Sequence, residues 1–121
     1  YKFENIKIIK LRRNMGLSFS RNLGLRLAKN KYVSFLDSDD LWDKNKLKKQ
    51  ISFMKNNNFL FSYTDYRTFG EKNRNVNNPS KIDHSGFLRN TSIATSTMMI
   101  KRNIIGSIKF TNTKICEDFF F

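Results

Sequence analysis

Hydrophobic and polar residues alternate along the first part of the chain in two successive patterns, which predict a strand followed by a helix. Residues 6–11, Ile-Lys-Ile-Ile-Lys-Leu, are rich in β-branched side chains and predict a short strand. A turn is expected at residues 14–16, and Ser18 is a candidate N-cap of a helix that continues to about Lys29. The buried face of this helix would consist of residues that recur at every fourth position: Phe19, Leu23 and Leu27.

The middle of the chain predicts a second strand and a second helix. Residues 32–36 form a short, mostly apolar run that ends at Asp37, which is the pattern of a buried parallel strand. Asp43 can cap the following helix, which would end at the asparagines of residues 56–58. The buried stripe expected for this helix consists of Leu47, Ile51 and Met54.

The remaining pattern predicts two more strands, at residues 59–64 and 95–100. Between them lie a polar loop at residues 71–82, which contains the only proline, and a possible short helix near residues 85–89. Strands that alternate with helices indicate an α/β layer structure with a largely parallel sheet. Ligands of such sheets bind beyond the carboxyl ends of the strands, where Asp37 and its neighbours are expected.

The length of 121 residues allows one domain. Both ends look interior to a longer domain, because Tyr1 almost directly precedes a predicted strand and residues 119–121 are three phenylalanines that would otherwise lie in water. We therefore expect one partial domain over residues 1–121. The alternative interpretation is a natural terminus with an exposed apolar tail.

Composition excludes several classes of protein. No apolar run approaches the ~20 residues that a membrane-spanning helix needs. One cysteine, Cys116, and one histidine, His84, allow neither an intramolecular disulfide nor a Cys/His zinc site. No signal peptide is recognisable, so we expect a cytoplasmic protein.

The formal net charge is +13, from 23 basic and 10 acidic residues. This excess favours an anionic partner, which could be nucleic acid, a phosphorylated small molecule or an anionic membrane surface. It is equally compatible with a composition that is merely rich in lysine and asparagine.

The few carboxylates are clustered, which points to chemistry. Asp37, Asp39 and Asp40 follow a predicted strand within four positions, and Glu117 and Asp118 are adjacent. Crowded carboxylates repel one another unless a cation neutralises them, and oxygen ligands of this kind suit Mg²⁺ or Mn²⁺. The alternative is a solvated loop that caps the next helix. An EF-hand-like calcium loop fits badly, because Trp42 stands where that loop needs glycine.

Several ordered motifs resemble the family-2 glycosyltransferases of the GT-A fold. They are Asn14-x-Gly16, Ser20-Arg21-Asn22-x-Gly24, Ala28, Tyr32-Val33-x-Phe35-Leu36-Asp37-Ser38-Asp39-Asp40, Trp42, the segment 95–102 and Glu117-Asp118. The resemblance extends from residue 6 to residue 119. It implies a Rossmann-like α/β fold with a mostly parallel mixed sheet and flanking helices, incomplete at both ends.

The resemblance implies a donor side that binds a nucleotide-diphosphate sugar, most commonly a UDP-sugar. Asp37 and Asp39 match the Asp-x-Asp motif that holds Mn²⁺ or Mg²⁺ and the ribose, with Asp39 as the more direct metal ligand. Asp40 would face the donor sugar or cap the next helix. Arg21 matches a position near the diphosphate, where its guanidinium suits phosphate oxygens. Asn14 is assigned to the same side, although it is more readily explained as a loop-fixing residue.

The resemblance also implies an acceptor side and an inverting mechanism. Asp118 matches the catalytic base, which takes the proton from the acceptor hydroxyl as that oxygen attacks the anomeric carbon. Glu117 would orient the site. Trp42, Thr95 and Ser96 would lie on the acceptor side, with Trp42 alternatively only packing the loop. The acceptor would be a glycan or a lipid-linked glycan of a bacterial surface polysaccharide, and the basic chain could contact the inner face of the membrane.

The sequence departs from the family pattern at its beginning, where no uracil-binding strand–helix unit precedes Tyr1. A catalytically inactive remnant is therefore an alternative expectation. A basic nucleic-acid-binding module is the other, and it is disfavoured because the aromatic residues fall at core spacing.

Overall fold

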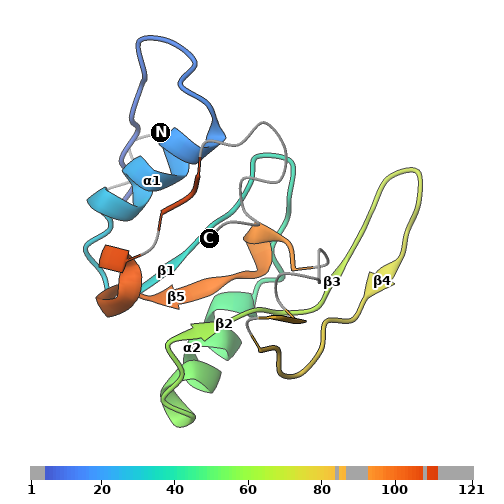
Figure 1. Cartoon of the computed structure of the whole chain (residues 1–121). Helices are drawn as coiled ribbons and strands as arrows, with labels where there is room; N and C mark the ends of the chain where they lie inside the picture. Colours follow the sequence, from blue (N-terminus) through green and yellow to red (C-terminus); the bar gives the residue numbers. More distant parts are fainter. Residues whose placement is uncertain (1–4, 84, 87–92, 108, 112–121) are drawn as a thin grey trace.

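Three short strands form the central sheet of the computed structural model, which describes residues 5–83, 85–86, 93–107 and 109–111 (Figure 1). The strands are β1 (Tyr32–Ser34), β2 (Phe61–Ser62) and β5 (Met99–Lys101), in the order β1-β5-β2. β5 pairs antiparallel with both neighbours, so β1 and β2 run in the same direction without pairing with each other. Helices and strands are both present as expected, but every described strand pair is antiparallel. In the central sheet this is because the chain returns through β5 between the two codirectional strands.

Two helices accompany this sheet, α1 (Leu17–Leu27) and α2 (Lys46–Asn56). Both were expected, within two or three residues at each end. Ser18 is not the N-cap of α1; that position is occupied by Gly16, which has a φ of 84° that favours glycine. The Asn14 side chain accepts a hydrogen bond from the Gly16 amide at 2.9 Å and so closes the preceding turn.

The buried faces of the helices differ from those that the sequence predicts. In α1 the buried residues are Ser18, Arg21 and Leu25, whereas Leu27 is 39% exposed. In α2 Gln50 and Met54 are buried, and Leu47 is 41% exposed. The reason is that polar side chains anchor both helices: Ser18 donates to the Thr111 carbonyl, and Arg21 and Gln50 bond to neighbouring loops and strands.

The predicted strand at residues 6–11 is wrong. These residues form no strand, and Ile6, Ile8 and Ile9 are 60%, 88% and 44% exposed. A strand needs a hydrogen-bonded neighbour, and none of the described strands pairs with this segment.

The strands predicted later in the chain are shorter than expected. Residues 95–97 form a 3₁₀ helix, η1 (Thr95–Thr97), before β5, and a second 3₁₀ helix, η2 (Arg102–Ser107), follows it. The helix suggested near residues 85–89 falls mostly outside the described residues.

The polar loop predicted at residues 71–82 contains β4 (Asn75–Val76), which pairs antiparallel with β3 (Tyr66–Arg67). This β3–β4 hairpin projects from the central sheet in Figure 1. Its two ends meet where the Asn78 side chain donates to the Thr64 carbonyl at 2.9 Å and the Asn78 amide donates to the Asp65 carboxylate at 2.7 Å.

The hydrophobic core lies around β5. Met98, Met99 and Ile100 are at most 1% exposed, and Met54 of α2 is equally buried. Phe35 and Phe110 pack edge to face with ring centroids 5.3 Å apart. This core holds the carboxyl end of β1 in place, and with it the loop that carries the clustered aspartates.

Candidate active site

The loop after β1 is fixed first by an ion pair between Arg21 and Asp37. Nη2 of Arg21 lies 3.2 and 3.1 Å from the two carboxylate oxygens of Asp37. Arg21 is only 8% exposed, and its guanidinium lies 5.2 Å from the centre of the Phe110 ring. A buried guanidinium that is paired and stacked holds its carboxylate partner in one position.

Ser96 fixes the same loop from the other side. The Asp37 amide donates to the Ser96 hydroxyl at 3.0 Å, and the indole nitrogen of Trp42 donates to the Ser96 carbonyl at 2.9 Å. Between these two points the Asp40 amide donates to the Asp37 carbonyl at 3.1 Å. One residue of η1 therefore anchors both ends of the segment that contains the aspartates.

Asp39 differs from Asp37 in its surroundings. It is exposed, and its carboxylate makes no hydrogen bond or ion pair with any residue that the structure describes. The described part of the chain contains no group of three or more His, Cys, Asp or Glu side chains that could enclose a metal ion. Asp39 alone offers an unpaired carboxylate at this loop, so a cation held there would have to complete its shell with substrate oxygens and water, as Mg²⁺ commonly does.

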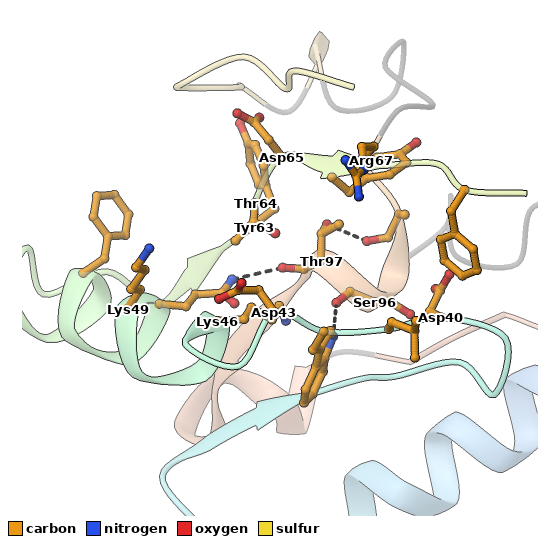
Figure 2. A pocket seen from close by; sticks show the side chains of 17 residues that line it. Asp40, Asp43, Lys46, Lys49, Tyr63, Thr64, Asp65, Arg67, Ser96 and Thr97 are labelled. Atoms are coloured by element: carbon orange, nitrogen blue, oxygen red, sulfur yellow. Dashed lines mark hydrogen bonds between the residues drawn. The ribbon is translucent and has the colours of Figure 1, made fainter. Parts of the chain in front are cut away.

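A cavity of about 1000 Å³ lies beside this loop and is lined by its residues Asp40 to Trp42 (Figure 2). It lies between the loop after β1, the first turns of α2, η1 and the segment that leads from β2 into the β3–β4 hairpin. Five aromatic side chains line it: Trp42, Phe53, Tyr63, Tyr66 and Phe69. Its charged lining consists of Lys46, Lys49 and Arg67 together with Asp40, Asp43 and Asp65.

Lys46 is the most perturbed titratable group in this cavity. Its ammonium lies 4.1 Å from the centre of the Trp42 ring and donates to the Ser34 hydroxyl at 3.3 Å. Burial lowers the pKa of Lys46 to about 8. Burial and the nearby Asp65 raise the pKa of Tyr63, whose hydroxyl donates to the Pro79 carbonyl at 2.6 Å.

The structure brings together some of the residues that the sequence singled out. Asp37 bonds to both Arg21 and Ser96, and Trp42 bonds to Ser96. Asp40, Trp42 and Ser96 line the cavity, whereas Thr95 is buried without lining it. Asn14 serves the turn before α1. Glu117 and Asp118 lie outside the described residues.

Sequence reasoning missed Lys46, Gln50 and Arg67 as cavity residues. A weak signal was present, because Lys46 follows Trp42 by four positions and Gln50 follows Lys46 by four. Position alone could not show that Lys46 and Gln50 are partly or fully buried.

Comparison with known proteins identifies the family. The family model described as glycosyl transferase family 2 matches residues 1–120. This chain belongs to glycosyltransferase family 2. No solved structure shows a significant match.

Curated relatives of this family-2 chain include proteins from two bacterial species. One, named as a teichuronic acid biosynthesis glycosyltransferase, TuaG, of Bacillus subtilis (strain 168), is 35% identical over 95% of this chain and 47% of the relative. The Escherichia coli UDP-Glc:alpha-D-GlcNAc-diphosphoundecaprenol beta-1,3-glucosyltransferases WfaP and WfgD are each 34% identical, over 90% and 87% of this chain and 45% and 42% of their own lengths. The chain thus spans slightly less than half the length of these three relatives. No helix among the described residues is long and apolar enough to cross a membrane.

Proposed function

We propose that this chain is the catalytic part of a metal-dependent, inverting glycosyltransferase that moves a sugar from a nucleotide-diphosphate donor, such as a UDP-sugar, to a glycan or lipid-linked acceptor. Family membership and the names of the relatives, which include UDP-Glc and diphosphoundecaprenol-linked acceptors, support a role in surface polysaccharide synthesis. The observation that carries the proposal is the loop after β1, where Asp37 is neutralised by Arg21 and Asp39 is left unpaired among the described residues.

On the donor side, Asp39 would hold Mn²⁺ or Mg²⁺, with Asp37 next to it. The cation would supply positive charge to the diphosphate as it leaves. Arg21 is too buried to present its whole guanidinium to a ligand, so its main contribution is to hold Asp37 and to lower the negative charge beside the diphosphate. Asp40, at the edge of the cavity, would face the donor sugar.

On the acceptor side, the cavity lined by Trp42 and Ser96 would place the acceptor hydroxyl against the donor sugar. Asp118 would accept the hydroxyl proton while the oxygen attacks the anomeric carbon from the face opposite the leaving group, and Glu117 would orient this site. A single displacement of this kind inverts the anomeric configuration. We place the reaction at the cytoplasmic side of the membrane, where donor nucleotides and lipid-linked acceptors meet.

The test uses the complete protein and measures UDP binding with and without Mn²⁺ by calorimetry. Asp39→Asn is expected to weaken Mn²⁺-dependent binding about tenfold or more, because the amide cannot replace a charged oxygen ligand. Glu71→Gln removes an exposed carboxylate from the β3–β4 hairpin and should leave binding unchanged. Binding by Asp39→Asn at the wild-type level would show that the metal assignment is wrong.

A further inference from the structure

The cavity beside the aspartate loop combines features that suit one kind of ligand. Its aromatic side chains offer flat apolar surface, and its carboxylates and amide offer hydrogen-bond partners for hydroxyl groups. Lys46 and Lys49 come from α2 and Arg67 comes from β3, and Lys49 and Arg67 lie on opposite sides of the cavity in Figure 2. The aromatic rings suit the apolar face of a sugar, and the three cations suit a negatively charged group on that sugar.

The three cations are not neutralised within the described chain. None of the three lies within 4.0 Å of a described carboxylate. The ion pair among the described residues is the one between Arg21 and Asp37. Two of the cavity carboxylates already accept backbone amides: Asp43 from Asn45 at 2.8 Å and Asp65 from Asn78 at 2.7 Å. The basic groups of the cavity therefore form no ion pair with its acidic groups among the described residues.

Lys46 is the cation best placed to bind an anion. A half-buried ammonium has three donors, and the described residues give this one a single hydroxyl acceptor, on Ser34, and the face of Trp42. Because a desolvated cation is costly without a counter-charge, an anionic group on Lys46 would stabilise it more than it would stabilise an exposed lysine. Trp42 in turn donates to the Ser96 carbonyl, and the Ser96 hydroxyl accepts from the Asp37 amide, so three contacts connect Lys46 to Asp37.

We propose that this cavity binds an anionic group of the acceptor, a phosphate or a carboxylate, on Lys46, with Lys49 and Arg67 adding charge from its walls. The inference rests on the proposed function, since it names the chemical class of the acceptor for that reaction. The sugar of the acceptor packs on the aromatic lining, and its hydroxyls bond to the cavity carboxylates. The cavity thus selects acceptors that carry negative charge, and Lys46 is the residue that binds the charged group.

The test compares three probes bound to the complete protein with Mn²⁺ and UDP present. They are N-acetylglucosamine linked through a diphosphate to a short alkyl chain, methyl glucuronide, and the neutral methyl glucoside. Lys46→Met is expected to weaken binding of an anionic probe about tenfold and to change binding of the neutral glucoside less than about twofold. Lys46→Arg, which keeps the charge, should recover most of the loss.

The matched control is Lys48→Met, which removes an exposed lysine of α2 that does not line the cavity. It should leave all probes unaffected. A loss confined to the diphosphate probe identifies a lipid-linked phosphate as the anion, and a loss confined to the glucuronide identifies a sugar acid. Equal losses for charged and neutral probes, or no loss for any probe, would overturn the proposal.

Mn²⁺-dependent UDP binding, measured in the same samples, separates two kinds of failure. If Lys46→Met binds UDP normally and binds the anionic probes like wild type, the acceptor inference is wrong while the donor site stands. If wild-type protein itself fails to bind UDP, the proposed function is wrong instead.

Discussion

Arg21 is a charged residue in the middle of a helix, yet it is among the most buried side chains of α1. Its burial is tolerated because the guanidinium pairs with both oxygens of Asp37 and packs on Phe110. The sequence motif predicted a role for Arg21 at the donor side. The structure adds the ion pair with Asp37, which spacing along the chain could not show.

Replacing Arg21 by methionine should therefore lower the stability of the protein. Arg21→Met is expected to reduce the free energy of unfolding by about 2 kcal/mol, because it removes two charge-assisted hydrogen bonds and leaves Asp37 without its partner. Urea unfolding of the complete protein measures the change. Arg26→Met, at an exposed position of the same helix, is the control and should change stability by less than about 0.5 kcal/mol. Equal stability of the two variants would contradict a structural role for the ion pair.

Single residues of the site were predictable to different degrees. The aspartates of residues 37–40 and Trp42 could be singled out because they follow an apolar run in a recognisable order. Lys46 and Gln50 could not, since lysine and glutamine in a helix usually face solvent. Their burial results from the way α2 meets the sheet, which is decided by the whole core and not by the local sequence.

At the scale of elements, Gln50 connects three of them. Its side-chain nitrogen lies 3.3 Å from the Ser62 carbonyl, 3.1 Å from the Ser62 hydroxyl and 3.0 Å from the Thr97 carbonyl. It thereby links α2 to β2 and to η1. Its own side-chain oxygen is buried with no hydrogen-bond partner among the described residues, so the side chain is held by its donor end alone.

Gln50→Leu is expected to destabilise the protein by about 2 kcal/mol, because the carbonyls of Ser62 and Thr97 lose a buried donor. Part of the loss is offset because the unsatisfied oxygen is removed as well. Chemical denaturation provides the measurement, and Ser52→Ala, at an exposed position of α2, provides the control. A gain in stability for Gln50→Leu would mean that the unsatisfied oxygen outweighs the three contacts.

Among the elements, the helices were predicted best and the strands least well. Helices α1 and α2 depend mainly on local periodicity and on the residues at their ends. Residues 6–11 have a strand-like composition but no described strand beside them. The β3–β4 hairpin escaped prediction because each of its strands has only two residues, too few to create an alternating pattern.

At the scale of the whole chain, the 121 residues carry a formal charge of +13. As part of the proposed function, this charge should bring the protein to anionic membranes, where lipid-linked acceptors lie. In sedimentation assays the complete protein is expected to bind vesicles that contain phosphatidylglycerol at low ionic strength. Most of the protein should be released at about 0.5 M salt, because screening then limits the electrostatic attraction to a few ångströms. Neutral phosphatidylcholine vesicles are the control, and equal binding to both lipids would contradict an electrostatic contact.

The arrangement of the sheet could not be derived from the order of its elements. Alternating strands and helices predict codirectional strands, and β1 and β2 are indeed codirectional. The order does not reveal that β5, from the far end of the described chain, lies between them. Long-range pairings of this kind are set by which apolar side chains can be buried together, here Met98, Met99 and Ile100.

The two ends of the β3–β4 hairpin meet at nearly one point, marked by the bonds of Asn78 to Thr64 and Asp65. Tyr66, Arg67 and Phe69, which form one wall of the cavity, belong to this hairpin. We therefore expect this hairpin to tolerate changes in its length and sequence. Insertions and deletions there would reshape the cavity wall without disturbing the central sheet or the aspartate loop. Under the proposed function, such changes would alter which acceptor is used and leave the donor side unchanged.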